Sequence, residues 1–132
     1  MGDRMKHIQD ALDHLKRLSI HVSRTSQWYE TKPVGFTRQR AFLNGVARIR
    51  PSLSPTGLFK ALKRVERAVG RTPTKRWGPR VMDLDILLYG NRKVRSSRLT
   101  IPHPRLHERG FVLIPLSELM SLRKLPGLKT HE

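Results

Sequence analysis

Residues 76–90 have the sequence RWGPRVMDLDILLYG. The part from Val81 to Tyr89 contains neither glycine nor proline and is followed by the turn signal Gly-Asn at positions 90–91, which is typical of a β-strand. Side chains alternate between the two faces of a strand, so Asp83 and Asp85 share one face and the apolar residues beside them share the other. This stretch therefore predicts a strand that buries one face in a core and carries two carboxylates on the other.

The two carboxylates follow several basic residues. Strand geometry separates the Cα atoms of Asp83 and Asp85 by roughly 7 Å, so their oxygens can reach a common point and hold Mg²⁺ ions of the kind used in phosphoryl transfer. Lys75, Arg76 and Arg80 lie just upstream, and guanidinium groups suit phosphate oxygens. The pattern predicts a nucleotide phosphoryl-transfer site. Two simpler interpretations stay open, namely acids that only face water and an ion-pair network between the acids and the arginines.

The longer pattern RWGPR-x-x-DLDILL, at residues 76–88, closely resembles the signature of the 6-hydroxymethyl-7,8-dihydropterin pyrophosphokinase family of folate-pathway enzymes. The resemblance extends from Gly2 to about Leu119, which is nearly the whole chain. It implies an α+β, ferredoxin-like fold. It also implies transfer of the β,γ-pyrophosphoryl group of ATP to the hydroxymethyl oxygen of the dihydropterin, with release of AMP.

The same resemblance implies roles for individual residues. Asp83 and Asp85 resemble the ligands of two Mg²⁺ ions, while Arg71 and Arg80 resemble catalytic arginines that clamp the triphosphate together with Arg76. The implied ATP contacts are Glu66, Arg76, Arg98, Thr100, His103 and Arg109. The implied pterin contacts are Thr31, Val34, Phe42, Asn44, Trp77 and Phe111. No side chain is identified as a general base.

The residues from Phe42 to Arg50 alternate in the manner of a strand, which places Phe42 and Asn44 on one face. An aromatic ring and an amide side by side suit a flat heterocycle, because the ring stacks while the amide reads the edge of the ligand. The alternative is that Phe42 is an ordinary core residue.

The remaining elements follow from periodicity and capping signals. The expected elements are a helix capped by Asp3 with the stripe Met5, Ile8, Leu12 and Leu15, a strand over Ser19–Thr31, and a loop to Arg40. A second helix is expected from the cap Ser54-Pro55 to the stop Gly70, with the stripe Leu58, Leu62, Val65 and Val69. After the polar residues 91–98 and an extended stretch at 99–104, the residues from Phe111 to Ile114 predict a buried segment that becomes helical near Leu116–Met120.

Composition indicates one globular domain, at residues 1–120, followed by a flexible tail at 121–132. The chain has 132 residues, of which 37% are hydrophobic, no cysteine, no run long enough to span a membrane and no signal-peptide core, which together indicate a cytoplasmic protein. Its net charge of +17 predicts attraction to polyanions. The expected partners are ATP and the dihydropterin, with nucleic acid bound only through non-specific charge.

The predicted order of elements is a βαββαβ pattern without its first strand, with two helices on one face of an antiparallel sheet. The second face would carry Phe42, Asn44, Asp83 and Asp85. Members of the resembled family begin with a further strand, central in the sheet, and we expect its loss to leave ladder groups unpaired. The alternative function is therefore that of a truncated or degenerate paralogue that binds RNA or another polyanion through its positive charge.

Overall fold

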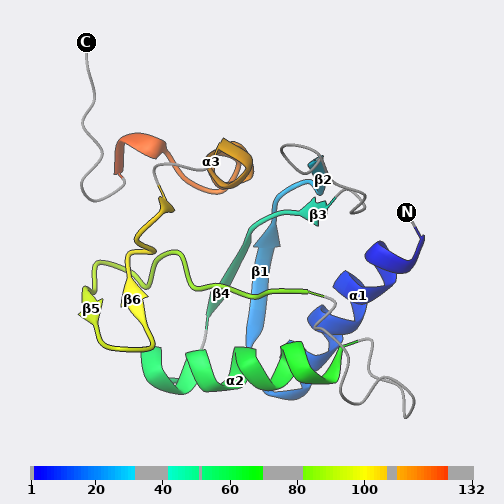
Figure 1. Ribbon diagram of the computed structural model, residues 1–132, viewed down its shortest axis with the longest axis horizontal. Coiled ribbons are helices and arrows are strands. Elements are labelled where there is room, and N and C mark those ends of the chain that lie inside the picture. Colours follow the sequence, from blue (N-terminus) through cyan, green and yellow to red (C-terminus); the bar gives the residue numbers. More distant parts are fainter. Residues whose placement is uncertain (1, 32–41, 51, 70–81, 107–109, 125–132) are drawn as a thin grey trace. The chain divides into compact units, whose positions relative to one another are not determined.

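The computed structural model describes residues 2–31, 42–50, 52–69, 82–106 and 110–124 (Figure 1). The helices within these ranges are α1 (Gly2–Arg17), α2 (Pro55–Ala68), α3 (Gly110–Ser117) and the short 3-10 helix η3 (Leu122–Lys124). The strands are β1 (His21–Thr25), β2 (Tyr29–Thr31), β3 (Phe42–Asn44), β4 (Ala47–Arg50), β5 (Val94–Arg95) and β6 (Thr100–Ile101). Helices combined with antiparallel strand pairs confirm the predicted α+β class.

Strand pairing differs from the single sheet that the sequence predicts. The described strands form three pairs, β1 with β4, β2 with β3, and β5 with β6, of which the last two are antiparallel. The chain also divides into two compact units, one made of residues 1–22 and 49–103 and the other of residues 23–48 and 104–132. Each unit therefore combines two segments that are distant in the sequence.

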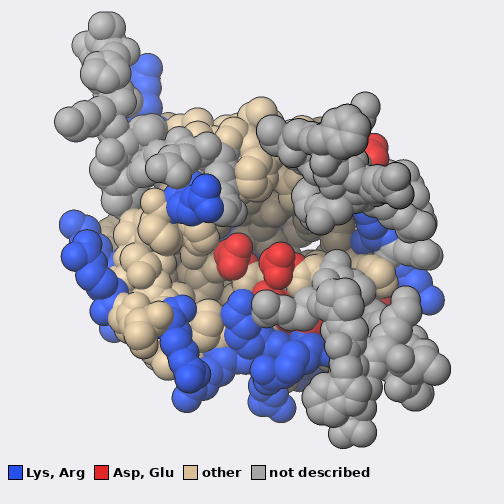
Figure 2. Space-filling model, in the orientation of Figure 1, with Lys and Arg blue, Asp and Glu red and all other residues tan. Residues whose placement is uncertain are grey.

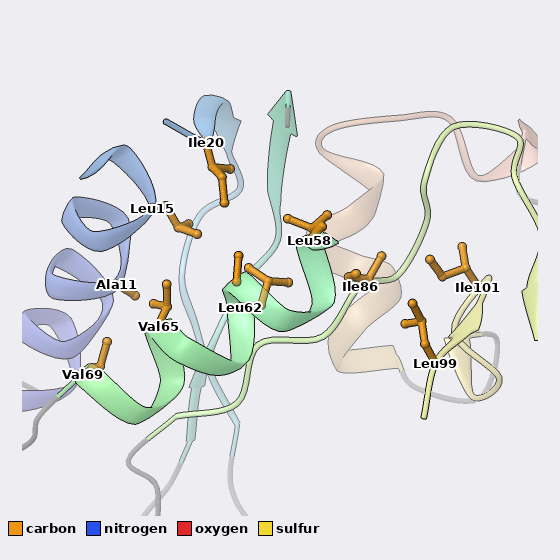
Figure 3. Packing of buried hydrophobic residues seen from close by; sticks show 11 residues of the cluster. Ala11, Leu15, Ile20, Leu58, Leu62, Val65, Val69, Ile86, Leu99 and Ile101 are labelled. Atoms are coloured by element: carbon orange, nitrogen blue, oxygen red, sulfur yellow. The ribbon is translucent and has the colours of Figure 1, made fainter. Parts of the chain in front are cut away.

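The first unit has a core built from α1, α2 and the segments that follow α2 (Figure 3). The predicted stripe of α2 is confirmed, because Leu58, Leu62, Val65 and Val69 are all buried. In α1, Ile8 and Leu15 are buried as predicted, but Met5 is 39% exposed, and Ala11 is the buried residue that the sequence analysis missed. Figure 3 shows Ala11 and Leu15 pointing toward α2, where a small residue allows the two helices to approach closely.

The predicted start of α2 is confirmed in detail. The Ser54 side chain accepts a hydrogen bond from the backbone N–H of Gly57 at 3.1 Å, and Pro55 is the first helical residue. The predicted stop at Gly70 lies outside the described residues. In α1, by contrast, the helix begins at Gly2, so Asp3 lies within the first turn and the prediction that it caps the helix is wrong.

The segment 82–89 is not a strand, although the side chains of residues 82–86 alternate as predicted. The alternation does not continue to Tyr89, which packs against the core. Asp83 and Asp85 are exposed, whereas Met82, Leu84 and Ile86 turn toward the core. The strand assignment is wrong because a strand requires a ladder of hydrogen bonds, and this extended segment pairs with none of the described strands. The alternation survives because the apolar side chains are still buried.

The predicted turn after this segment is confirmed. Gly90 has a φ of 55°, a left-handed conformation that glycine adopts at little cost, and the N–H of Arg92 donates to the carbonyl of Tyr89 at 3.0 Å. The polar residues that follow contain β5, which pairs with β6, so this region is a short hairpin where the sequence analysis expected only an excursion.

The second unit contains the β2–β3 pair. Its register places Thr31 opposite Phe42 and Tyr29 opposite Asn44. Both long strands of the sequence analysis are interrupted: Ser19–Thr31 becomes β1 and β2, and Phe42–Arg50 becomes β3 and β4.

The second interruption falls at Gly45, where a Cβ atom would lie 2.4 Å from a ring carbon of Trp28. Buried Ser26 links the two interruptions, because its N–H donates to the carbonyl of Val46 at 2.8 Å and its side chain accepts from the N–H of Val46 at 2.9 Å. The close approach of the Trp28 ring to the Gly45 backbone thus coincides with the break in both strands.

Helix α3 differs from the prediction in position and burial. It spans Gly110–Ser117 and therefore begins well before Leu116. Phe111 and Ile114 are 42% and 58% exposed, so the expected burial is wrong for these two residues, while Val112 and Leu113 are half-buried. The fully buried residues of the helix are Pro115 and Leu116. The uniformly apolar sequence of the segment has no periodicity that could have shown which side faces outward.

Candidate functional site

Asp83 and Asp85, the predicted metal ligands, both lie exposed on the segment 82–89 of the first unit. Leu84 between them packs against the core, and Ile86 after them is 8% exposed. The alternation that buries these apolar side chains directs both carboxylates to the outside. Both acids are thus exposed on the same segment, and their role as metal ligands stays a prediction.

Glu66, on α2, is hydrogen-bonded to the backbone of this segment. Glu66 is only 1% exposed, and its carboxylate accepts a hydrogen bond from the backbone N–H of Leu84 at 2.5 Å. Lys63, one turn earlier on α2, lies 3.3 Å from both carboxylate oxygens of Glu66. A buried carboxylate is costly unless it is paired and hydrogen-bonded, and these contacts meet that requirement.

The sequence analysis assigned Glu66 to ATP, and that assignment stays a prediction. Its structural role was missed, although one signal was available. Glu66 is the only acid between Thr31 and Arg80, and it directly follows Val65, a member of the apolar stripe of α2. An acid at the margin of a buried face indicates a buried partner more strongly than an acid in a solvated helix face.

Three of the predicted ATP contacts lie at or near the β5–β6 hairpin of the same unit. Thr100 begins β6 and is half-buried, Arg98 is exposed, and His103 follows the cis peptide bond between Ile101 and Pro102. The backbone N–H of His103 donates to the carbonyl of Leu87 at 2.9 Å. This bond ties the hairpin to the segment that carries the two acids.

Four of the predicted pterin contacts fall within the described residues, and all four lie in the second unit. Thr31 and Phe42 are direct partners in the β2–β3 register. The side-chain amide of Asn44 donates to the backbone carbonyl of Phe111 at 2.7 Å, and Phe111 is 42% exposed. The structure therefore brings together an amide and an accessible aromatic residue that lie 67 positions apart in the sequence.

Glu118 adds a contact that the sequence analysis did not identify. Its carboxylate accepts hydrogen bonds from the backbone N–H of Gln27 at 2.9 Å and from the hydroxyl of Tyr29. The Tyr29 hydroxyl, followed by the Gln27 N–H and the charge of Arg24, holds the pKa of Glu118 below its usual value. The bond to Glu118 in turn raises the pKa of Tyr29. No local sequence signal could have found a pair separated by 89 positions.

The remaining predicted site residues lie outside the described part of the chain. They are Val34, Arg71, Arg76, Trp77, Arg80 and Arg109. Their roles stay predictions from the resemblance.

Basic side chains gather over α2 in the view of Figure 2. On this helix Lys60, Arg64 and Arg67 are exposed, while Lys63 is half-buried and lies over the ring of Phe59, 5.3 Å from its centroid. The clustering accounts for part of the net charge of +17. Such a surface attracts anions in general and carries no information about a particular partner.

The donor set fits Mg²⁺ carried by a phosphate substrate. Within the described ranges, no group of three or more His, Cys, Asp or Glu side chains could hold a metal ion. Magnesium is commonly bound through one or two carboxylates together with substrate phosphates and water, and a pair of exposed carboxylates is compatible with that mode of binding. None of the helices described here is long and apolar enough to cross a membrane.

Comparison with known proteins places the chain in a family. Residues 1–121 match the family described as 7,8-dihydro-6-hydroxymethylpterin-pyrophosphokinase (HPPK). A 2-amino-4-hydroxy-6-hydroxymethyldihydropteridine pyrophosphokinase of Haemophilus influenzae is 44% identical over 124 residues, covering 93% of this chain and 78% of that protein. A protein of the same name from Bacillus subtilis is 42% identical over 120 residues, covering 90% of this chain and 72% of its own length.

A longer plant relative shows the same similarity over a small part of its length. The "Folate synthesis bifunctional protein, mitochondrial" of Pisum sativum is 47% identical over 120 residues, which cover 91% of this chain but only 23% of the plant protein. The family match covers most of this chain, and the bacterial relatives agree over most of their own length. The chain belongs to the 7,8-dihydro-6-hydroxymethylpterin-pyrophosphokinase family.

Proposed function

We propose that this chain transfers the β,γ-pyrophosphoryl group of ATP to 6-hydroxymethyl-7,8-dihydropterin. The hydroxymethyl oxygen forms a bond to the β-phosphorus, the bond between that phosphorus and the α,β-bridging oxygen breaks, and AMP leaves. The hydroxyl proton passes to solvent, since no side chain is assigned as a general base. The products are AMP and the pterin diphosphate.

The observation that carries this proposal is the exposed carboxylate pair on a segment whose alternate residues enter the core. Asp83 and Asp85 would hold two Mg²⁺ ions brought in with ATP, and those ions would neutralise charge on the phosphates during transfer. Glu66 supports the pair through the backbone of Leu84. The contribution of the chain is positioning, which is the main requirement of phosphoryl transfer.

The pterin would bind at the β2–β3 pair and α3. The exposed ring of Phe111 suits stacking on a flat heterocycle, and the side-chain amide of Asn44 suits its polar edge. Phe42 and Thr31 would contribute from the adjoining register positions. The proposed pterin site therefore takes residues from both chain segments of the second unit.

The test is the identity of the nucleotide product. The purified chain is incubated with ATP, Mg²⁺ and the dihydropterin, and the nucleotides are separated by chromatography. We expect AMP to form only when the pterin is present, with an equal amount of pterin diphosphate. Formation of ADP, or of AMP without the pterin, would exclude the proposed reaction.

The polyanion-binding alternative has less support. The basic face of α2 attracts anions, but this property does not require the exposed acids or the bond between Asn44 and Phe111. Family membership favours the transferase. Omission of Mg²⁺ separates the two functions, because it should stop the transfer reaction while leaving charge-driven binding in place.

A further inference from the structure

Helix α3 lies beside the β2–β3 pair in the second unit (Figure 1). Side chains near both of its ends form hydrogen bonds with residues of these strands. Near its first residue, the side-chain amide of Asn44 donates to the carbonyl of Phe111 at 2.7 Å. Directly after its last residue, Glu118 accepts from the N–H of Gln27 at 2.9 Å and from the hydroxyl of Tyr29. Both attachments lead to the same pair of strands, because Tyr29 is the register partner of Asn44.

Apolar packing holds helix α3 mainly near its C-terminal end. It has eight residues, and helices this short are marginal without tertiary contacts. Phe111 and Ile114 are 42% and 58% exposed and Val112 and Leu113 are half-buried, so the fully buried residues of the helix, Pro115 and Leu116, lie near its end. Hydrogen bonds to the strands therefore have a large share in setting where the helix lies.

We propose that Glu118 is a positioning residue for the pterin-binding surface, because it fixes α3 on the strand that faces Asn44 and thereby sets the place of Phe111. The inference rests on the proposed function and adds to it a residue that neither the signature nor the resemblance assigns. Glu118 itself need not touch the ligand.

The geometry explains why a carboxylate serves at this position. Two oxygens on one side chain accept a backbone N–H and a phenolic hydroxyl together, so the end of α3 is joined to both Gln27 and Tyr29. Charge-assisted hydrogen bonds are stronger than neutral ones. A helix held in this way presents its aromatic residue already in place, which reduces the entropy lost when a ligand stacks on it.

A further bond strengthens the same attachment. The guanidinium of Arg48 donates to the carbonyl of Leu119, next to Glu118 in the chain. Removal of Glu118 alone should therefore loosen α3 without releasing it, so the unit can fold while the position of Phe111 becomes less defined. This makes the role testable by substitution.

The experiment compares Glu118→Ala and Glu118→Gln with the unchanged chain and with Ser117→Ala. Ser117 is the matched control, since it is exposed, lies next to Glu118, and donates only to the carbonyl of Ile114 within the same helix turn among the contacts seen. The first readout is the side-chain amide signal of Asn44 in nitrogen-15 NMR spectra without ligand. The second is the dissociation constant of the dihydropterin, measured beside that of a non-hydrolysable ATP analogue.

For Glu118→Ala we expect a shifted and faster-exchanging Asn44 amide, and dihydropterin binding weakened by about tenfold, the scale of one charge-assisted hydrogen bond. Binding of the ATP analogue should change little, and kcat should fall less than the pterin KM rises. Glu118→Gln keeps one acceptor oxygen and should be intermediate. Ser117→Ala should match the unchanged chain.

Two results would overturn the proposal. One is an Asn44 signal that is the same in every variant. The other is an equal loss of pterin and nucleotide binding in step with a lower melting temperature, which would make Glu118 a general stabilising residue. If the unchanged chain binds no dihydropterin, the proposed function fails, while the Asn44 signal still decides whether Glu118 positions α3.

Discussion

The buried carboxylate of Glu66 accepts a hydrogen bond from the backbone N–H of Leu84 at 2.5 Å, between the two exposed acids of the candidate metal site. A backbone N–H that is taken away from water needs a hydrogen-bond acceptor, and the Glu66 carboxylate supplies one here. The bond joins α2 to the segment 82–89, which has no ladder with the described strands. Glu66 therefore supports the local geometry of Asp83 and Asp85 whether or not it also contacts ATP.

We expect Glu66→Leu to destabilise the fold by about 1–3 kcal/mol, because it leaves the Leu84 N–H without its acceptor. It should also raise the Mg²⁺ concentration needed for half-maximal turnover. Glu66→Gln keeps an acceptor oxygen and should be milder in both respects. Denaturant unfolding and Mg²⁺ titration measure the two effects.

Lys63→Met is the control for this prediction, since it removes the ion pair with Glu66 but keeps the bond to Leu84. It should leave the Mg²⁺ requirement unchanged. If Lys63→Met raises that requirement as much as Glu66→Leu does, the ion pair and not the backbone contact supports the segment.

Substitution of Asp83 or Asp85 by Ala should abolish turnover and leave the melting temperature nearly unchanged. Both side chains are exposed, so neither contributes a buried contact, and removal of one acid also relieves repulsion between like charges. Asp13→Ala, at an exposed acid on α1, is the matched control and should retain full activity. If the Asp83 or Asp85 variant turns over at the rate of the control, that residue is not a required metal ligand.

The helical part of the first unit was predictable because its signals are local. Ser54, Pro55 and the stripe from Leu58 to Val69 lie within one stretch, and capping and periodicity act over a few residues. The exposure of Asp83 and Asp85 was predictable for the same reason, since alternation depends only on extended backbone. Whether the segment 82–89 forms a strand was not predictable, because a ladder of hydrogen bonds depends on a partner elsewhere in the chain.

The second unit was less predictable because long-range contacts shape it. The break at Gly45 depends on the ring of Trp28, and the place of α3 depends on Tyr29 and Asn44, far away in the sequence. The apolar run from Phe111 to Leu116 gave no period from which an exposed side could be inferred. The resemblance identified Phe111 and Asn44 as pterin residues. Only the structure showed that the side-chain amide of Asn44 is hydrogen-bonded to the backbone carbonyl of Phe111.

The close approach of Trp28 to Gly45 gives a prediction for the second unit. An added Cβ at Gly45 would lie 2.4 and 2.6 Å from two ring carbons and 2.9 Å from the Ser26 hydroxyl. We expect Gly45→Ala to lower stability by about 1–3 kcal/mol, the usual cost of overpacking. Near-ultraviolet circular dichroism of the Trp28 environment and denaturant unfolding report the change.

Gly110→Ala provides the matched control for that substitution. A Cβ at Gly110, the first residue of α3, would have no atom of the described residues within 4 Å, and alanine favours the helix by about 0.5–1 kcal/mol over glycine. Its effect should be neutral or stabilising. Equal loss of stability in both variants would show that the Trp28 contact does not determine the choice of glycine.

Phe111→Ala should weaken dihydropterin binding by about 1–3 kcal/mol, the scale of one aromatic stacking platform. Phe111 is 42% exposed, so its removal should lower the melting temperature less than removal of a fully buried phenylalanine would. Ile114→Ala, at a residue of the same helix that is 58% exposed, is the control and should leave pterin binding intact. Equal weakening by both substitutions would point to a general effect on α3, and the stacking role would be rejected.

The pair Tyr29 and Glu118 predicts how the attachment of α3 depends on pH. Hydrogen bonding from Tyr29, then from the Gln27 N–H, together with the charge of Arg24, lowers the pKa of Glu118. A carboxyl with a lowered pKa in the folded state contributes stability above its ordinary pKa and loses that contribution as the pH falls through the folded value. The pKa of Tyr29 is raised from about 10, so its contribution is complete below that value and is lost as the pH rises through the folded one.

We therefore expect the attachment of α3 to be constant through the neutral range and to weaken at both extremes of pH. The Asn44 amide signal and dihydropterin affinity, followed across pH, measure it directly. Glu118→Gln should abolish the weakening at low pH (the acid limb), because no carboxyl remains to be protonated. Tyr29→Phe should abolish the weakening at high pH (the alkaline limb). An acid limb that persists in Glu118→Gln, with the same midpoint, would assign the transition to another group and contradict the role of this pair.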